Sequence, residues 1–324
     1  MKMHTKRWRI AAALAAAALA TTACGGDDAG DDGADTGGET TDTDTDTDTD
    51  TDTDTDATGD EGGEAAADGE FEAGSTMAEI QEAGVLRVGV KYDQPLFGVQ
   101  TPGGVEGFDA EIARLIAEGI FGEGGGDNIE WSEAVSAVRE DVLESDSVDI
   151  VVATYTINDE RKERVGFAGP YYVAGQDIMV AAGNPEGING VEDLDGQPVC
   201  SVEGSTSIDN LREMAPEAEV VALDTYSACA EELEQGRVNA VTTDNVILIG
   251  LIDENPDAFE LVDNPFTEEP YGIGVQQDAD DFRDWINDRL EEIYESSEWE
   301  QAWNDTAGAV VEAPEPPAVD RYEG

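Results

Sequence analysis

The sequence predicts an α/β fold, and three observations lead to this prediction. Short apolar runs typical of buried strands recur along the chain from Val85 onward. Between them lie segments whose apolar residues return every three or four positions, as on the inner face of a helix. The connections between these segments are short, as in domains that alternate strands and helices. With 324 residues, the chain is long enough for one or two domains with substantial cores.

The first 23 residues have the order of a bacterial secretion signal. A basic segment, residues 2–9, precedes an Ala/Leu-rich run, residues 10–20, that is too short to span a bilayer. Small residues then lead to Cys24, which resembles the cysteine of a lipobox and implies cleavage before it, acylation, and anchoring on the extracellular face of the cell membrane. Thr21 stands where lipoboxes usually have an aliphatic residue, so a soluble secreted protein is the alternative.

Residues 24–75 are predicted to form a disordered acidic tether. They consist largely of Gly, Asp, Glu and Thr, with eight Thr-Asp pairs in residues 41–56. Such a segment cannot bury enough apolar surface to offset its ordering entropy, and its like charges extend it. We expect a spacer that lets an anchored domain clear a thick cell wall. Calcium binding is the alternative, although the repeats lack the glycine turn of a calcium loop.

The charge balance makes several partners and chemistries poor candidates. The net charge is −60, from 16 Lys+Arg against 76 Asp+Glu, so nucleic acid and anionic membrane surfaces are poor partners. The single histidine, His4, lies in the predicted leader. The mature chain therefore lacks Ser-His-Asp and Cys-His chemistry as well as the commonest metal ligand. We expect no cofactor and no metal site.

The predicted elements follow one another from residue 75. Strands are expected at residues 85–90, 130–131, 148–153, 177–182, 198–202, 220–223, 238–243 and 271–276. Helices are expected at residues 76–83, 109–121, 138–143, 207–214, 227–235, 245–252 and 282–293 and around residues 299–303. Thr76 and Asp109 are predicted caps of the first two helices. The Pro-rich end, residues 312–324, is expected to be disordered.

Polar side chains follow the apolar strand that precedes Thr154. Thr154 and Thr156 are two residues apart, so on a strand end they would project from the same face. A short polar turn then leads to Arg161. Two hydroxyls and a guanidinium can hold a small planar anion such as a carboxylate. The alternative is an edge strand whose Arg161 pairs with Glu160 or Glu163.

The stretch VVATYTINDER resembles the signature of the amino-acid-binding proteins of bacterial ABC importers, solute-binding family 3. The stretches VGVKYDQP, FAGPYYVAGQD, TTDNVIL and FTEEPYGIG extend this resemblance over residues 85–308, most closely to actinobacterial glutamate-binding lipoproteins. The resemblance implies a two-lobed fold of the type II periplasmic-binding-protein kind. Lobe 1 would comprise residues 77–173 and 271–311, and lobe 2 residues 174–270, with the ligand in the cleft between them.

The resemblance also implies a function. A monomeric protein would capture an extracellular acidic amino acid, close its lobes, and deliver the ligand to the permease subunits of an ABC importer without catalysis. Two other classes stay open, because a few dehydratases resemble this family and a sensory or adhesive surface protein could share the same architecture.

The family's ligand contacts can be carried over to individual residues. Its contacts to the α-carboxylate fall on Thr154, Thr156, Arg161, Ser205 and Thr206. An acid at the position of Asp244 accepts the α-ammonium group in the family. Read without the resemblance, Ser205, Thr206 and Asp244 would simply cap helices.

Two further bases are predicted to hold the side-chain carboxylate of glutamate. Lys91 ends the first strand, where open α/β sheets present ligand sites. Arg139 matches an Arg often found in the acidic-amino-acid binders of the family. The alternative for Arg139 is a surface ion pair with Glu140 or Asp141, whereas Arg87 and Arg114 are expected to be solvated. Aspartate, glutamine and other amino acids stay open as ligands.

Cys200 and Cys229 are the remaining cysteines of a chain expected to be exported, so a disulfide is predicted between them. It would close a loop of about 30 residues and stabilise the fold by roughly 3–4 kcal/mol in the chain-entropy model.

Overall fold

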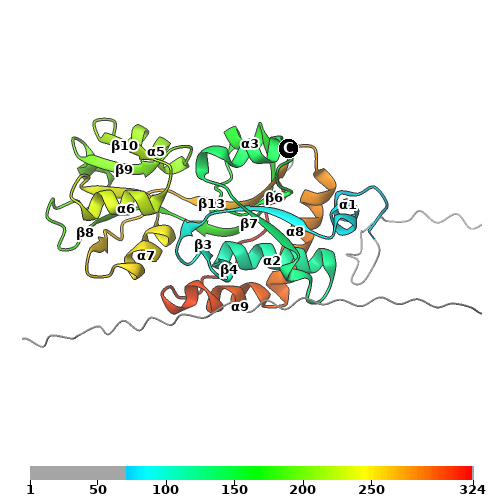
Figure 1. Ribbon diagram of the computed structural model, residues 1–324. Coiled ribbons are helices and arrows are strands. Elements are labelled where there is room, and N and C mark those ends of the chain that lie inside the picture. Colours follow the sequence, from blue (N-terminus) through cyan, green and yellow to red (C-terminus); the bar gives the residue numbers. More distant parts are fainter. Residues whose placement is uncertain (1–70, 323–324) are drawn as a thin grey trace, which may run out of the picture. The chain divides into compact units, whose positions relative to one another are not determined.

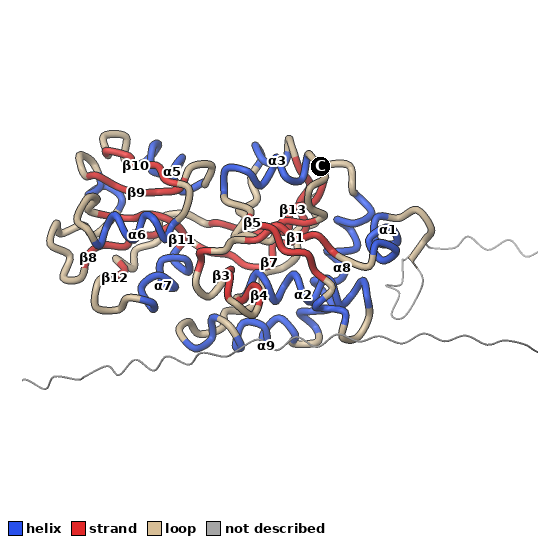
Figure 2. Tube along the Cα trace, viewed as in Figure 1, coloured by secondary structure: helices blue, strands red, loops and turns tan. Residues whose placement is uncertain are grey.

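The computed structural model describes residues 71–322, which belong to one compact unit of the chain. These residues form two five-stranded sheets covered by helices and one small three-stranded sheet (Figures 1 and 2). The predicted α/β class is confirmed. No helix within residues 71–322 is long and apolar enough to cross a membrane. The predicted signal segment, Cys24 and almost all of the predicted tether lie outside the described residues.

The first sheet has the strand order β5-β1-β6-β13-β7. Its strands are β1 (Leu86–Val90), β5 (Ile129–Glu133), β6 (Ile150–Val151), β7 (Val165–Ala174) and β13 (Glu269–Gln276). The first three run parallel to one another, whereas β13 runs antiparallel to both of its neighbours. We call this sheet and its helices lobe 1.

Helices cover both faces of the lobe 1 sheet (Figure 1). The larger core lies under α1 (Thr76–Ala83), α2 (Phe108–Phe121), α8 (Asp280–Glu295) and α9 (Glu298–Asp305). The other face is covered by α3 (Arg139–Glu144). In α9 the rings of Trp299 and Trp303 stack 5.7 Å apart and are fully buried, so both tryptophans are core residues.

The second sheet repeats the arrangement with the order β10-β9-β11-β8-β12. Its strands are β8 (Gln176–Ala181), β9 (Pro198–Val202), β10 (Glu219–Leu223), β11 (Ala240–Asp244) and β12 (Phe259–Leu261). The helices packed on it are α5 (Thr206–Met214), α6 (Tyr226–Glu234) and α7 (Asn245–Glu254). We call this sheet and its helices lobe 2.

The chain crosses between the lobes twice. Only Gly175 separates β7 of lobe 1 from β8 of lobe 2, and the chain returns between β12 and β13. The small sheet belongs to the segment after β1 and consists of β2 (Asp93–Gln94), β3 (Gly98–Thr101) and β4 (Gly104–Glu106). Short 3-10 turns lie at Gly125–Asp127, Ser136–Val138, Val191–Leu194 and Ala307–Ala309.

The predicted disulfide is confirmed. Cys200 of β9 and Cys229 of α6 are bonded, with their Cα atoms 5.5 Å apart and both side chains fully buried. The bond therefore ties a lobe 2 helix to the centre of the lobe 2 sheet.

Two predicted helix caps are wrong. Ser75, not Thr76, caps α1 by accepting a hydrogen bond from the amide of Ala78, and the Thr76 hydroxyl instead donates to Asp281 of α8. The capping position of α2 is Gly107, with φ at 122°. Asp109 lies inside the first turn of α2 and its carboxylate points to other elements, as described below.

The C-terminal segment differs from the predicted disorder up to Tyr322. Val311, Ala313 and Val319 pack against the lobe 1 core, and the amide of Asp320 donates to the carbonyl of Gly169 at 2.9 Å. Proline restricts the chain to extended conformations. A Pro-rich segment therefore loses less entropy on ordering than a flexible tail would.

Candidate functional site

A small cavity is lined by side chains from both lobes. Six of the eight predicted ligand contacts line it, namely Arg139, Thr154, Thr156, Ser205, Thr206 and Asp244. Its other lining residues are Ser136, Ser207, Tyr226, Thr243 and Ile247. Hydroxyls, one guanidinium and one carboxylate therefore meet at one small space between the lobes.

Thr154 lies in a bend after β6 and not on a strand end. Its φ is 44°, in the left-handed region that residues other than glycine rarely adopt. Its amide donates to Asp109 Oδ2 at 2.8 Å, and its hydroxyl is 3.0 Å from Gln94 Oε1. The strand-period reason for pairing Thr154 with Thr156 is therefore wrong, although both line the cavity.

Arg161 is positioned by α4 (Asp159–Lys162), a single helical turn. Asn158 caps this turn by accepting from the Arg161 amide at 2.8 Å. The guanidinium is buried and donates through Nη1 to the carbonyl of Thr156 at 2.6 Å. Through Nη2 it reaches the carbonyl of Gly204 in lobe 2 at 3.1 Å. Arg161 therefore connects the two lobes at the edge of the cavity.

The acid beside Arg161 is Glu140, whose Oε1 lies 3.4 Å from Nε. Pairing of Arg161 with Glu160 or Glu163, the alternative considered from the sequence, does not occur in residues 71–322. Arg161 lines an adjoining, wider cavity that shares Ser136 and Thr206 with the first. Arg161 thus lines the adjoining cavity and not the first.

Arg139 is buried, and all its hydrogen bonds within the described residues go to backbone carbonyls. Nη1 donates to the carbonyls of Ala153 and Thr154 at 3.1 and 3.3 Å. Nη2 donates to the carbonyl of Gly204 at 3.4 Å. Burial, followed by the nearby charge of Arg161, lowers the pKa of Arg139 to about 10. The surface ion pair with Glu140 or Asp141 does not form.

Lys91 follows β1 and is 2% exposed. Its Nζ donates to the hydroxyl of Ser136, a cavity-lining residue, at 2.8 Å. Burial, reinforced by the charge of Arg139, lowers the pKa of Lys91 to about 7. Lys91 itself does not line the cavity, so it would act on a ligand from behind Ser136.

The turn before α5 contributes hydroxyls from lobe 2. Ser205 caps α5, since its Oγ accepts from the amide of Ile208 at 3.1 Å. Thr206 donates to Glu269 Oε2 at 2.8 Å and lies 3.5 Å from the Thr156 hydroxyl. Ser205 therefore acts as the predicted cap, while Thr206 faces lobe 1.

Asp244 occupies the capping position of α7, but its side chain makes no capping hydrogen bond. Oδ2 accepts from the Tyr271 hydroxyl at 2.6 Å, whereas the buried Oδ1 has no partner among the described residues. Burial, with the charge of Glu269 next, raises the pKa of Asp244 to about 7. A cationic ligand group would satisfy Oδ1 and favour the ionised carboxylate.

Several residues of the site were not predicted from the sequence. Glu269 accepts from Thr206 and Tyr271 supports Asp244, while Tyr155 lies beneath both arginines of the site. Tyr155 stands between the two predicted threonines, and this position in the motif was the one signal that the sequence offered. The partners of Glu269 and Tyr271 depend on contacts distant in sequence.

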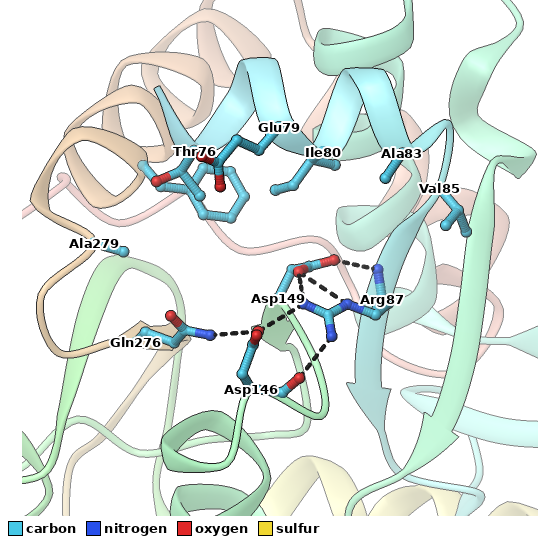
Figure 3. Close-up of a pocket in the computed structure, with 11 residues that line it drawn as sticks. Thr76, Glu79, Ile80, Ala83, Val85, Arg87, Asp146, Asp149, Gln276 and Ala279 are labelled. Atoms are coloured by element: carbon cyan, nitrogen blue, oxygen red, sulfur yellow. Dashed lines mark hydrogen bonds and ion pairs between the residues drawn. The ribbon is translucent and has the colours of Figure 1, made fainter. Parts of the chain in front are cut away.

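Another cavity lies at the opposite end of β1 (Figure 3). The guanidinium of Arg87 there bonds to Asp146 at 2.7 Å and to Asp149 at 2.5 Å. Gln276 donates to the same Asp146. Because its cation is already paired with two carboxylates, this cavity has no unpaired charge to offer an anionic ligand.

Two α/β lobes with a polar cavity between them define the class of two-lobed amino-acid-binding proteins of the periplasmic-binding-protein type. The chain belongs to the bacterial extracellular solute-binding proteins, family 3, whose model matches residues 86–305. The predicted family is thus confirmed.

Relatives and a solved structure extend this finding. The chain is 36% identical over 251 residues to the glutamate-binding protein GluB of Corynebacterium efficiens, covering 75% of this chain and 85% of that protein. It is 38% identical over 231 residues to the ABC transporter glutamine-binding protein GlnH of Bacillus subtilis, covering 70% and 83%. An ancestral arginine-binding protein bound to glutamine matches with a TM-score of 0.64 and 34% identity over 69% of this chain and 98% of that one. All three are named as binding proteins.

Proposed function

We propose that the protein captures an acidic amino acid, with glutamate as the preferred ligand. One observation carries the proposal: Lys91 and Arg139 are both buried, and no carboxylate of residues 71–322 lies within 4.0 Å of either cation. A buried charge without a counter-charge is costly, and a ligand carboxylate at this place would supply the missing partner.

The proposed binding mode assigns each ligand group to side chains. Thr154, Thr156 and Arg161 of lobe 1 and the Ser205–Thr206 turn of lobe 2 would hold the α-carboxylate. The free Oδ1 of Asp244 would accept the α-ammonium group. Arg139, supported by Lys91 through Ser136, would face the side-chain carboxylate.

The relatives support an amino-acid ligand without deciding between glutamate and glutamine, because GluB is named for the first and GlnH for the second. Charge favours glutamate. The amide of glutamine would leave Arg139 and Lys91 without an anionic partner, at a cost of a few kcal/mol.

The remaining proposals concern cellular context. Cys24 would carry the lipid anchor, and the protein would act as a monomer that delivers its ligand to an ABC permease at the extracellular face of the membrane. Intact mass of the membrane-extracted protein tests the anchor, and an unmodified Cys24 would overturn it.

Replacement of Arg139 by Met tests the ligand assignment. Isothermal calorimetry with glutamate and glutamine should show tight glutamate binding by the wild type. In Arg139→Met, glutamate should weaken by about tenfold or more relative to glutamine, since only glutamate loses a charge partner. Arg212→Met, which removes a half-exposed arginine of α5, is the matched control and should leave both affinities unchanged.

Equal losses for both ligands, or a wild type that prefers glutamine, would overturn the assignment to glutamate. The same incubations, analysed by mass spectrometry, should return glutamate unchanged. A dehydrated or otherwise converted product would instead favour an enzyme on this scaffold.

A further inference from the structure

We propose that Tyr155 is a positioning residue of the ligand site. Its ring holds the guanidiniums of Arg139 and Arg161 together, and so sets the spacing at which the two cations meet the two carboxylates of a dicarboxylic amino acid. This inference rests on the proposed function and assigns a role to a side chain that does not line the cavity.

The geometry places one ring next to two cations. The guanidinium carbon of Arg139 lies 4.2 Å from the ring centroid of Tyr155, and that of Arg161 lies 5.0 Å from it. Tyr155 is fully buried, and both arginines are buried as well. Cation–π attraction is strongest when it is shielded from water, as it is here.

The site needs such a device because its cations repel one another. Arg139 and Arg161 both donate to the carbonyl of Gly204, so their guanidiniums converge on one atom. Among the acids of residues 71–322, only Glu140 lies within ion-pair distance of either guanidinium, and it pairs with Arg161 and not with Arg139. A further carboxylate would offset the repulsion but would also cancel the charge that attracts the ligand. A neutral ring attracts both cations and leaves their charge available.

The ring is itself held in place. It packs edge-on against Phe167, with the ring centroids 4.8 Å apart. On its other side is Gly274 of β13, where a Cβ would lie only 2.9 Å from the ring. The hydroxyl of Tyr155 has no hydrogen-bond partner among the described residues. The aromatic ring, and not the hydroxyl, is therefore the functional part of this side chain.

Two substitutions separate the ring from the hydroxyl. Tyr155→Phe keeps the ring and should leave glutamate affinity within about twofold of wild type, because no hydrogen bond is lost. Tyr155→Leu keeps an apolar side chain without a π face and should weaken glutamate by roughly tenfold or more. The loss for glutamine should be smaller, since glutamine uses the charge of Arg161 alone.

A double-mutant cycle separates positioning from packing. If the ring acts through Arg139, Tyr155→Leu should cost less glutamate affinity in an Arg139→Met background than in the wild type. Equal costs in both backgrounds would mean that the ring merely fills space, and would overturn the proposal.

Fluorinated phenylalanines at position 155 provide a test that does not depend on the folding of Tyr155→Leu. Each added fluorine weakens the negative face of the ring with little change in size, so glutamate affinity should fall stepwise with fluorine number. Affinity independent of fluorination would reject the role of the ring while the proposed function stands. If the wild type binds neither glutamate nor glutamine in calorimetry, the proposed function fails and the inference fails with it.

Discussion

Thr154 shows how single residues of this site are held by distant partners. Its left-handed backbone costs conformational energy, and the buried carboxylate of Asp109 accepts its amide at 2.8 Å. The Tyr171 hydroxyl donates to the other oxygen of the same carboxylate at 2.7 Å. Burial raises the pKa of Asp109 to about 7. Asp109, which was predicted to cap α2, thus supports the backbone of the proposed ligand site.

Arg161→Ala should nearly abolish the binding of every amino acid, because all of them share the α-carboxylate. Removing one partner of a buried charge pair costs about 2–5 kcal/mol, or roughly 30-fold to several-thousand-fold in affinity. Calorimetry with glutamate, glutamine and aspartate measures the loss. Wild-type affinity in this variant would show that Arg161 does not bind the ligand and serves only to join the carbonyls of Thr156 and Gly204.

The preference for glutamate over glutamine should fall as the pH rises. Lys91 has a pKa of about 7 in the ligand-free protein, so it is mostly protonated below pH 7 and mostly neutral above it. Only the protonated form assists a side-chain carboxylate, and binding above pH 7 must therefore include uptake of a proton. The ratio of glutamate to glutamine affinity should drop by up to about tenfold per pH unit above pH 7.

Lys91→Met is the control for this pH dependence. In this variant the ratio of glutamate to glutamine affinity should be low and should not change between about pH 6 and pH 8, since the remaining cation at the cavity, Arg139, does not titrate in that range. Because the two ligands share their α-groups, titration of Asp244 affects both and cancels in the ratio. If the affinity ratio of Lys91→Met still fell steeply as the pH rises, the proton taken up on glutamate binding would belong to another group.

At the scale of elements, the C-terminal segment is part of lobe 1. It adds apolar contacts from Ala313 and Val319 and an ion pair between Arg321 and Asp288 of α8. Tyr322 packs near α4, with Lys162 Nζ 5.2 Å from its ring centroid. The segment therefore covers the edge strand β7 on the lobe that holds Arg161.

Removal of residues 312–324 should lower the free energy of unfolding by about 2–3 kcal/mol, from lost apolar burial and the hydrogen bond to Gly169. Urea unfolding measures the change. A variant that keeps the segment and replaces only the half-exposed Arg321 by Ala should lose less than about 1 kcal/mol. Equal stability of the truncated and full chains would show that the segment contributes nothing in solution.

At the scale of the whole molecule, polar contacts hold the lobes together. Asp93, on β2 next to lobe 1, places Oδ2 at the start of α6 in lobe 2. This oxygen lies 3.1 and 3.2 Å from the amides of Tyr226 and Ser227 and 3.3 Å from the Ser227 hydroxyl. A carboxylate at a helix N-terminus is favoured by the exposed amides and the helix dipole.

Asp93→Ala should shift the protein toward an open state and weaken the binding of both glutamate and glutamine. A loss of about 1–3 kcal/mol in closure corresponds to roughly 5-fold to 150-fold in affinity. Calorimetry measures the affinity, and small-angle scattering at saturating glutamate measures closure through the radius of gyration. Glu106→Gln, which changes an exposed acid of the same small sheet, should alter neither.

Unchanged affinity and unchanged scattering in Asp93→Ala would show that this contact does not govern closure. Loss of glutamate affinity with unchanged scattering would also contradict the assignment, because Asp93 would then act on the ligand through the charge of Lys91 and not through closure.

Local patterns in the sequence were sufficient for the α/β class, for most strand and helix positions, and for the Cys200–Cys229 bond. The spacing of apolar residues and the residue preferences of turns and helix ends extend over only a few positions, so they can be read directly from the sequence. The family motif likewise located Thr156, Thr206 and Asp244, which line one cavity, and Arg161, which lines the adjoining one.

Only the tertiary structure decided which distant groups meet. The contact of Asp109 with Thr154 spans 45 positions, and that of Asp93 with Tyr226 spans 133. Such contacts depend on sheet register and on the packing of the lobes, which no local pattern encodes. The same holds for the burial of Lys91 and Arg139. Their unpaired charge, the basis of the proposed glutamate preference, arises because the fold removes both from water without bringing a carboxylate to them.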